Sequence, residues 1–98
     1  MLHKDEILQT LRQLKGSLSH YGVSRVGLFG SSLRGDASED SDIDILIDFF
    51  SDKETYQNFV SSCELLEGAL DNQKLDIVTV NGLSPYIGKH ILNETEYV

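Results

Sequence analysis

Apolar residues near the start of the chain recur at helical spacing. Intervals of four, three, four and three separate the members of this stripe, which are Ile7, Leu11, Leu14, Leu18 and Tyr21. Residues at such intervals lie on one face of an α-helix and can pack against a core. The stripe predicts a helix from about Asp5 to His20, which Gly22 ends.

Polar and apolar residues alternate through positions 42–49, where the sequence is Asp-Ile-Asp-Ile-Leu-Ile-Asp-Phe. Successive side chains of a β-strand point to opposite faces of the sheet. Ile43, Ile45 and Ile47 therefore share one face with Phe49, while the aspartates lie on the other. We predict a half-buried strand with carboxylates on its exposed face.

Two further strands and one loop are predicted from composition. Val23–Phe29 and Leu75–Val80 carry β-branched and other apolar residues without helical spacing, which is typical of short strands. Residues 30–40 gather Gly, Ser, Asp and Glu between two of the strands. We expect a turn-like connection there, with one helical turn at Ser31–Arg34.

Two more helices are predicted after the alternating strand. An apolar stripe carries the second helix to about Leu70, and Asp52 is a good N-cap for it. Ser84 is expected to cap a last helix that has Pro85 at its first position and ends near Asn93.

The order of elements predicts the fold class. Helix, strand, loop, strand, helix, strand and helix follow one another without a linker, repeat or low-complexity tract, so we expect one α/β (α+β) domain over residues 1–98. The helices should cover the apolar face of the sheet. The carboxylates then remain on the open face.

Charge and composition exclude several classes of function. The 98 residues include 16 acidic and 8 basic side chains, so the formal net charge is -8. A broad basic surface for nucleic acid is not expected, and binding to acidic membranes is not expected either. No apolar run approaches the roughly 20 residues that cross a bilayer. Cys63 is the single cysteine, which excludes a disulfide framework and predicts a cytoplasmic protein.

Carboxylates form the first candidate site. Asp42 and Asp44 project from the same face of a strand, roughly 6 to 7 Å apart at the backbone, so their oxygens can converge on one cation. Hard oxygen ligands favour Mg²⁺ or Mn²⁺. If the strand that carries Asp76 pairs beside them, three aspartates could hold two metal ions. The competing interpretation is a set of solvated turn residues, which we adopt for Asp40 and Asp48.

A loop rich in glycine and serine forms the second candidate site. Gly30-Ser31-Ser32-Leu33-Arg34-Gly35 follows a strand and could offer backbone N–H groups to phosphate oxygens, although a tight turn would explain the same residues. A P-loop is excluded because Asp36-Ala37 stands where Lys and Ser or Thr are required. An EF-hand is excluded because Ser41 and Ile47 replace its glycine and its glutamate.

The two candidate sites combine into one signature, which is Gly30-Ser31, a ten-residue spacer, Asp42-Ile43-Asp44 and a later Asp76. Together with Arg34-Gly35 and Ser41, it closely resembles the minimal nucleotidyltransferase (MNT) group of the DNA polymerase β superfamily. The resemblance spans Val23 to Val80 and extends more loosely to the closing stretch 91–94.

The resemblance implies a fold and a reaction. The fold is a small mixed β-sheet with helices on one face and the carboxylate site on the other. The reaction moves a nucleoside monophosphate, in particular AMP from ATP, onto a hydroxyl acceptor. By resemblance, Asp42 and Asp44 would ligate two Mg²⁺ ions, for which Mn²⁺ could substitute. Asp76 would hold the catalytic ion and help deprotonate the hydroxyl, while Gly30 and Ser31 would grip the β and γ phosphates.

Three side chains keep two interpretations each. Arg34 would add positive charge at the phosphates or, equally well, fix the loop through a salt bridge to Asp36 or Glu39. Tyr56 and Tyr86 could stack on a base or pack within the protein. The three histidines show no metal-ligand spacing and are given no catalytic role.

The resemblance also implies a partner. Minimal members of the family are often paired with a helical HEPN toxin, a ribonuclease, and some act as antitoxins by adenylylating it. We expect such a partner, in a hetero-oligomer, and an acidic surface is compatible with docking on a basic protein. The alternative is a non-catalytic binding module that neutralises a partner protein by contact alone.

Overall fold

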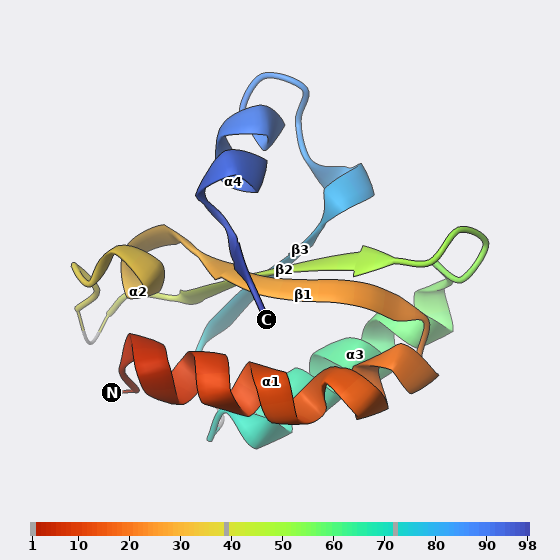
Figure 1. Ribbon diagram of the computed structural model, residues 1–98, viewed down its shortest axis with the longest axis horizontal. Coiled ribbons are helices and arrows are strands. Elements are labelled where there is room, and N and C mark those ends of the chain that lie inside the picture. The colour runs from red at the N-terminus through yellow and green to blue at the C-terminus, as the bar shows by residue number, and fades with distance from the viewer. Residues whose placement is uncertain (1, 39, 72) are drawn as a thin grey trace.

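Strands of one sheet alternate with helices along the chain (Figure 1). The structure is a computed structural model and describes residues 2–38, 40–71 and 73–98. Its elements in chain order are α1 (Lys4–His20), β1 (Val23–Phe29), α2 (Gly30–Arg34), β2 (Ile43–Phe49), α3 (Tyr56–Ala69), β3 (Leu75–Thr79), the 3₁₀ helix η1 (Val80–Gly82), α4 (Gly88–Glu94) and β4 (Glu96–Tyr97). Within this described part, no helix is both long and apolar enough to cross a bilayer.

The sheet is mixed, as predicted. Its strand order is β3-β2-β1-β4, with β1 antiparallel to both of its neighbours and β2 parallel to β3. The short strand β4 was not expected from the sequence. It pairs with Gly27 and Leu28 of β1, and two residues are too few to show an alternating pattern.

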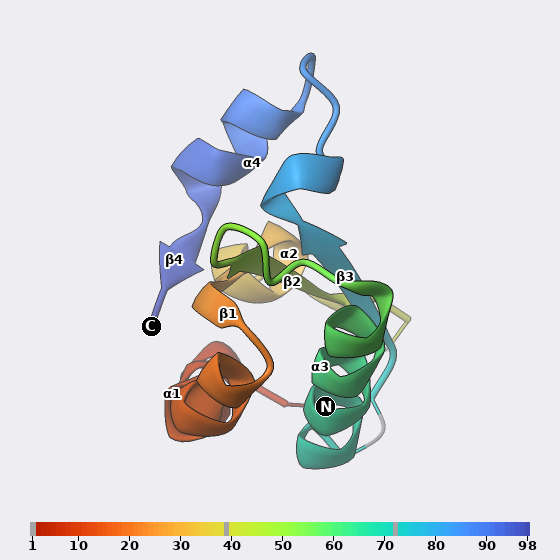
Figure 2. The same ribbon diagram turned by 90° about the vertical axis from the view of Figure 1, so that its right-hand side faces the viewer.

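The two long helices, α1 and α3, cover one face of the sheet (Figures 1 and 2). The predicted apolar face of β2 points toward them, and Ile43, Ile45 and Ile47 are buried there. They pack in one cluster with the buried residues of the helices, among them Ile7, Leu11, Leu18 and Leu66. This core fixes the orientation of β2, and the aspartates of β2 must then face the other side.

The last helix differs from the prediction because α4 lies on the carboxylate side of the sheet (Figure 2). The strand order gives the reason. β3 and β4 are at opposite edges, so the chain between them must cross one face, and α1 and α3 already occupy the other. The crossing covers part of the carboxylate face, where Leu46 of β2 is fully buried.

Two predicted helix starts are wrong because local turns come first. Thr55, not Asp52, caps α3, and its side chain accepts a hydrogen bond from the N–H of Asn58 at 3.1 Å. Asp52 lies in the preceding turn with φ 68°. Ser84 does not begin α4: its hydroxyl accepts from the N–H of Tyr86 at 3.2 Å in a turn, and the helix starts at Gly88.

Candidate active site

Strands β2 and β3 bring the three predicted aspartates to one end of the sheet. Asp44 and Asp76 are direct partners in the parallel register of these strands. Neighbouring strands lie about 4.8 Å apart, and partners in a parallel pair face the same way. Asp42 immediately precedes β2, where the N–H of Ile43 donates to the carbonyl of Lys74 at 2.9 Å. The condition set by the sequence, that the strand of Asp76 pairs beside Asp44, is therefore met.

The charges of these aspartates act on one another. Burial raises the pKa of Asp44 to about 6, and the neighbouring charges of Asp76, Asp42 and Glu94 contribute to the rise. The positive charge of Arg34 opposes it. A carboxyl group in such a field is costly to ionise unless a cation is added. Asp44 thus lies at the centre of the negative charge.

The donor set fits a hard divalent cation, because it consists of carboxylate oxygens on one face. As the side chains stand, Asp42 is paired with Lys74, with 3.8 Å between Oδ1 and Nζ, and Asp76 is exposed. Among the described residues, no three His, Cys, Asp or Glu side chains are gathered into a metal-binding arrangement. Binding an ion would require the aspartate side chains to turn toward one another, and Oδ2 of Asp42 is available because Lys74 pairs with Oδ1.

The glycine loop lies directly against Asp44. Phe29, the last residue of β1, is the partner of Asp44 in the antiparallel register, and Gly30 follows it with φ 75°. A Cβ added at Gly30 would overlap Oδ2 of Asp44 and lie 2.9 Å from its Cγ. Only glycine allows the backbone to approach the carboxylate this closely. The two candidate sites of the sequence are thus parts of one site.

The helical turn predicted in this loop is present as α2. The carbonyl of Ser31 accepts from the N–H of Gly35 at 2.9 Å and from the N–H of Asp36 at 3.1 Å, and Gly35 ends the turn with φ 87°. The guanidinium of Arg34, the last residue of α2, donates hydrogen bonds to Asp36 and to Glu94. Gly30, Ser31 and Arg34, the predicted phosphate-binding residues, therefore belong to one short structural unit.

Glu94 is a residue of this site that the sequence analysis missed. Its Oε1 atom accepts from the N–H of Gly30 at 3.0 Å and from the guanidinium of Arg34 at 2.6 Å. Arg34 also binds Asp36 at 3.4 Å, so one predicted salt bridge is present, while Glu39 lies outside the described residues. Hydrogen bonds to Glu94 and Asp36 raise the pKa of Arg34. Sixty residues separate Glu94 from Arg34, and only the loose family resemblance of stretch 91–94 pointed to it.

Among the described contacts of this site, Nε2 of His90 lies 3.8 Å from Oε2 of Glu94, whereas Tyr56, Tyr86 and Cys63 take no part. Tyr56 and Tyr86 are 84% and 93% exposed, so neither is held by packing. Burial raises the pKa of the Cys63 thiol, which is half-buried on α3, as expected of an unreactive cysteine.

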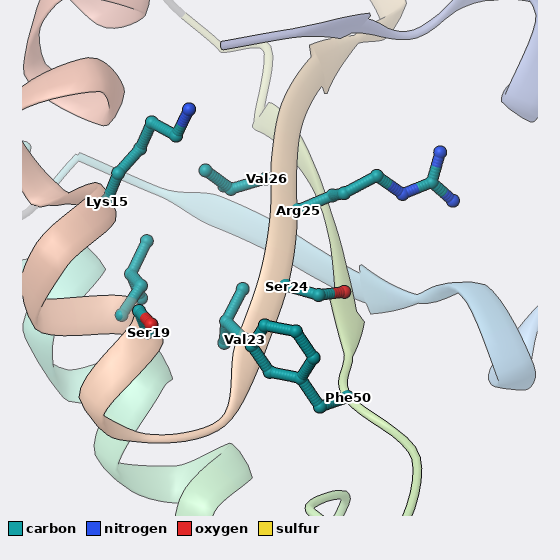
Figure 3. A pocket seen from close by; sticks show the side chains of 8 residues that line it. Lys15, Ser19, Val23, Ser24, Arg25, Val26 and Phe50 are labelled. Carbon is teal, nitrogen blue, oxygen red and sulfur yellow. The ribbon is translucent and has the colours of Figure 1, made fainter.

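A hollow of about 170 Å³ lies at the other end of β1, away from the aspartates (Figure 3). Lys15 and Ser19 of α1 line it together with Val23 and Val26 of β1 and with Phe50. Arg25, also at its margin, donates to Asp48 at 2.9 Å. Asp42, Asp44 and Asp76 do not line this hollow, so the candidate site remains the face of the sheet that carries Asp44.

The mixed sheet, the glycine loop and the aspartates on one face are features of enzymes that transfer nucleotides. The profile of the nucleotidyltransferase domain matches residues 5–98, and the chain belongs to this family. It is also 40% identical, over 99 residues, to the protein adenylyltransferase MntA of Thermococcus cleftensis, a match that covers 100% of this chain and 98% of the relative. The family resemblance predicted from the sequence is confirmed, and the chain is a nucleotidyltransferase.

Solved structures share this fold. A structure named as a minimal nucleotidyltransferase is 30% identical, superposes with a TM-score of 0.83, and is matched over 97% of this chain and 95% of that chain. A crystal structure of a toxin-antitoxin with AMP-PNP shares the fold, with a TM-score of 0.65 and 23% identity over 98% of this chain and 72% of that chain. Nucleotidyltransferases of this family generally use divalent metal ions.

Proposed function

We propose that the chain is a protein adenylyltransferase that moves AMP from ATP onto a hydroxyl group of a partner toxin in the cytoplasm, and so acts as an antitoxin. The relative from Thermococcus cleftensis is a protein adenylyltransferase, and a similar fold occurs in a toxin-antitoxin structure with AMP-PNP. A HEPN-type partner follows from the family resemblance. The net charge of -8 favours docking on a basic surface of that partner.

One observation carries the catalytic part of the proposal. Asp44 is in register with Asp76 on one side and in contact with the Gly30 loop on the other. This arrangement supports the proposal because nucleotidyl transfer requires metal-binding carboxylates next to groups that bind phosphate. Asp42, Asp44 and Asp76 would hold two Mg²⁺ ions, or Mn²⁺ in their place. When bound, the ions would supply the positive charge that the triphosphate and the leaving pyrophosphate need.

Protein groups bind the triphosphate, orient it and accept the proton of the acceptor hydroxyl. The N–H of Gly30, Ser31 and the guanidinium of Arg34 bind the β and γ phosphates and orient the α-phosphorus. The acceptor oxygen forms a bond to that phosphorus while the bond to the β-phosphate oxygen breaks, and pyrophosphate leaves. Asp76 is exposed and can take the proton of the acceptor hydroxyl. Most of the rate enhancement then comes from positioning and charge neutralisation.

The proposal predicts labelling of the partner that depends on the aspartates. The chain, its neighbouring gene product, Mg²⁺ and ATP labelled in the adenosine are incubated, and label on the partner and released pyrophosphate are measured. Asp42→Ala with Asp44→Ala should lose transfer, by about 10³-fold or more. Asp48→Ala is the matched control, because Asp48 is on the same strand but pairs with Arg25. If the double variant neutralises the partner as well as the unmutated chain does, and neither labels it, the contact-only binding module is the correct function.

A further inference from the structure

Glu94 accepts hydrogen bonds from two donors that the proposed triphosphate would also use. Its Oε1 atom accepts a hydrogen bond from the N–H of Gly30 at 3.0 Å and another from the guanidinium of Arg34 at 2.6 Å. The side chain of Glu94 is well enclosed, with 17% of its surface exposed, and its other oxygen, Oε2, lies 3.8 Å from Nε2 of His90, a largely exposed residue one turn earlier on α4. Glu94 is therefore held by the loop and is not a surface glutamate.

The charge of Glu94 is of the same kind as that of a phosphate. One N–H group cannot make two full hydrogen bonds, and a carboxylate repels a polyphosphate placed at the same donors. Arg34 is already matched by Glu94 and by Asp36, so its positive charge is compensated within the chain. A triphosphate that binds Gly30 and Arg34 must displace this carboxylate.

The helix that carries Glu94 is lightly attached. Of the described residues of α4, Gly88 alone is buried. Tyr86 and Ile87, in the turn before the helix, are exposed. Figures 1 and 2 show α4 on the side of the sheet opposite α1 and α3. Motion of the side chain or of this short helix can thus release the loop without disturbing the main core.

We propose that Glu94 is an internal competitor of the triphosphate: its carboxylate occupies Gly30 and Arg34 in the free chain and leaves them when ATP binds. Glu94 then lowers the affinity for ATP and couples the position of α4 to nucleotide binding. This inference rests on the proposed function, because it uses the same phosphate-binding donors.

The test compares Glu94→Gln with Glu96→Gln by calorimetric titration. Both variants remove one negative charge, but Glu96 faces Lys4 at 3.5 Å and lies two residues beyond Glu94. The probes are ATP and inorganic tripolyphosphate, each with Mg²⁺. Glu94→Gln should bind both probes about threefold to tenfold more tightly than the unmutated chain, since it gives up a partly exposed charge-assisted contact. Glu96→Gln should stay within about twofold.

Each outcome decides the proposal. Unchanged or weaker binding by Glu94→Gln overturns the competition, and weaker binding would make Glu94 a positioning residue for Arg34. Equal tightening by Glu96→Gln also overturns it, because net charge would then be the cause. If Glu94→Gln does not fold, Glu94→Asp shortens the reach and should tighten binding in the same direction. Failure of the inference alone leaves the unmutated chain binding ATP and transferring AMP. If neither the unmutated chain nor Glu94→Gln binds either probe, the proposed function fails as well.

Discussion

Replacing Asp44 by asparagine is expected to abolish AMP transfer and, in the metal-free chain, to raise stability at neutral pH. The loss of transfer should reach about 10³-fold, because the amide cannot supply the charge that holds the metal ions. The gain in stability has a separate cause. Burial disfavours the charged form of Asp44, the charges of Asp76, Asp42 and Glu94 add to this cost, and the neutral amide avoids both penalties. Residues placed for chemistry often cost stability in this way.

The stability gain of Asp44→Asn should depend on pH. The pKa of Asp44 is about 6 in the fold, above the value of about 3.9 in an unfolded chain. The folded state therefore binds the proton more tightly, and this contribution is complete below about pH 4 and is lost as the pH rises through 6. Urea unfolding should show little difference between the two chains at pH 4 and an advantage of about 1 kcal/mol for Asp44→Asn at pH 7.5, after allowance for solvent screening.

Asp48→Asn serves as the control for that comparison. Asp48 is on the same strand, but its carboxylate accepts from Arg25 at 2.9 Å, so its charge is compensated. This variant should show no gain at pH 7.5. A pH-independent difference for Asp44→Asn, or a less stable Asp44→Asn chain at pH 7.5, would contradict the electrostatic account of the site.

Gly30→Ala should be the most damaging conservative substitution in the loop. The added Cβ would overlap the carboxylate of Asp44, and φ at this position is 75°, where a side chain is strained. Together these effects should lower the free energy of unfolding by about 2–4 kcal/mol and remove AMP transfer. Gly35→Ala is the matched control. Gly35 has φ 87°, but no atom of the described residues lies within 4 Å of an added Cβ, so strain alone should cost it about 1 kcal/mol.

A double variant separates the clash at Gly30 from the backbone strain. In an Asp44→Ala background the overlapping carboxylate is absent and only the contact with Cβ of residue 44, at 3.1 Å, remains, so Gly30→Ala should cost clearly less there than in the unmutated chain. Urea unfolding of the four chains of this cycle measures the coupling. The proposed contact between the loop and Asp44 would be wrong if the cost of Gly30→Ala were the same in both backgrounds.

Much of the fold follows from local pattern. The stripe of α1 and the alternation in β2 each repeat several times, so they fix both the type of element and its buried face. Helix starts are harder to predict from local pattern. Thr55 and Ser84 each belong to a turn whose hydrogen bonds decide where the next helix begins. β4 is too short to carry a pattern and depends on the edge of β1.

The site was predictable where its residues are close in sequence or bear a known spacing. Gly30, Asp42 and Asp44 form one signature, and Asp76 is brought to them by strand pairing that the sequence left conditional. Glu94 was not predictable, because its contacts depend on α4 crossing the carboxylate face of the sheet. That crossing follows from the positions of β3 and β4 at opposite edges of the sheet, and no local sequence pattern indicates these positions.

In the proposed function, Asp42, Asp44 and Asp76 hold the metal ions that serve the nucleotide. The most direct measurement is anomalous diffraction from crystals grown with Mn²⁺ and a non-hydrolysable ATP analogue. We predict manganese peaks at about 2.1 Å from carboxylate oxygens of all three aspartates, with the phosphates of the analogue at Gly30 and Arg34. An analogue bound elsewhere, or manganese held without Asp44 and Asp76, would contradict the account.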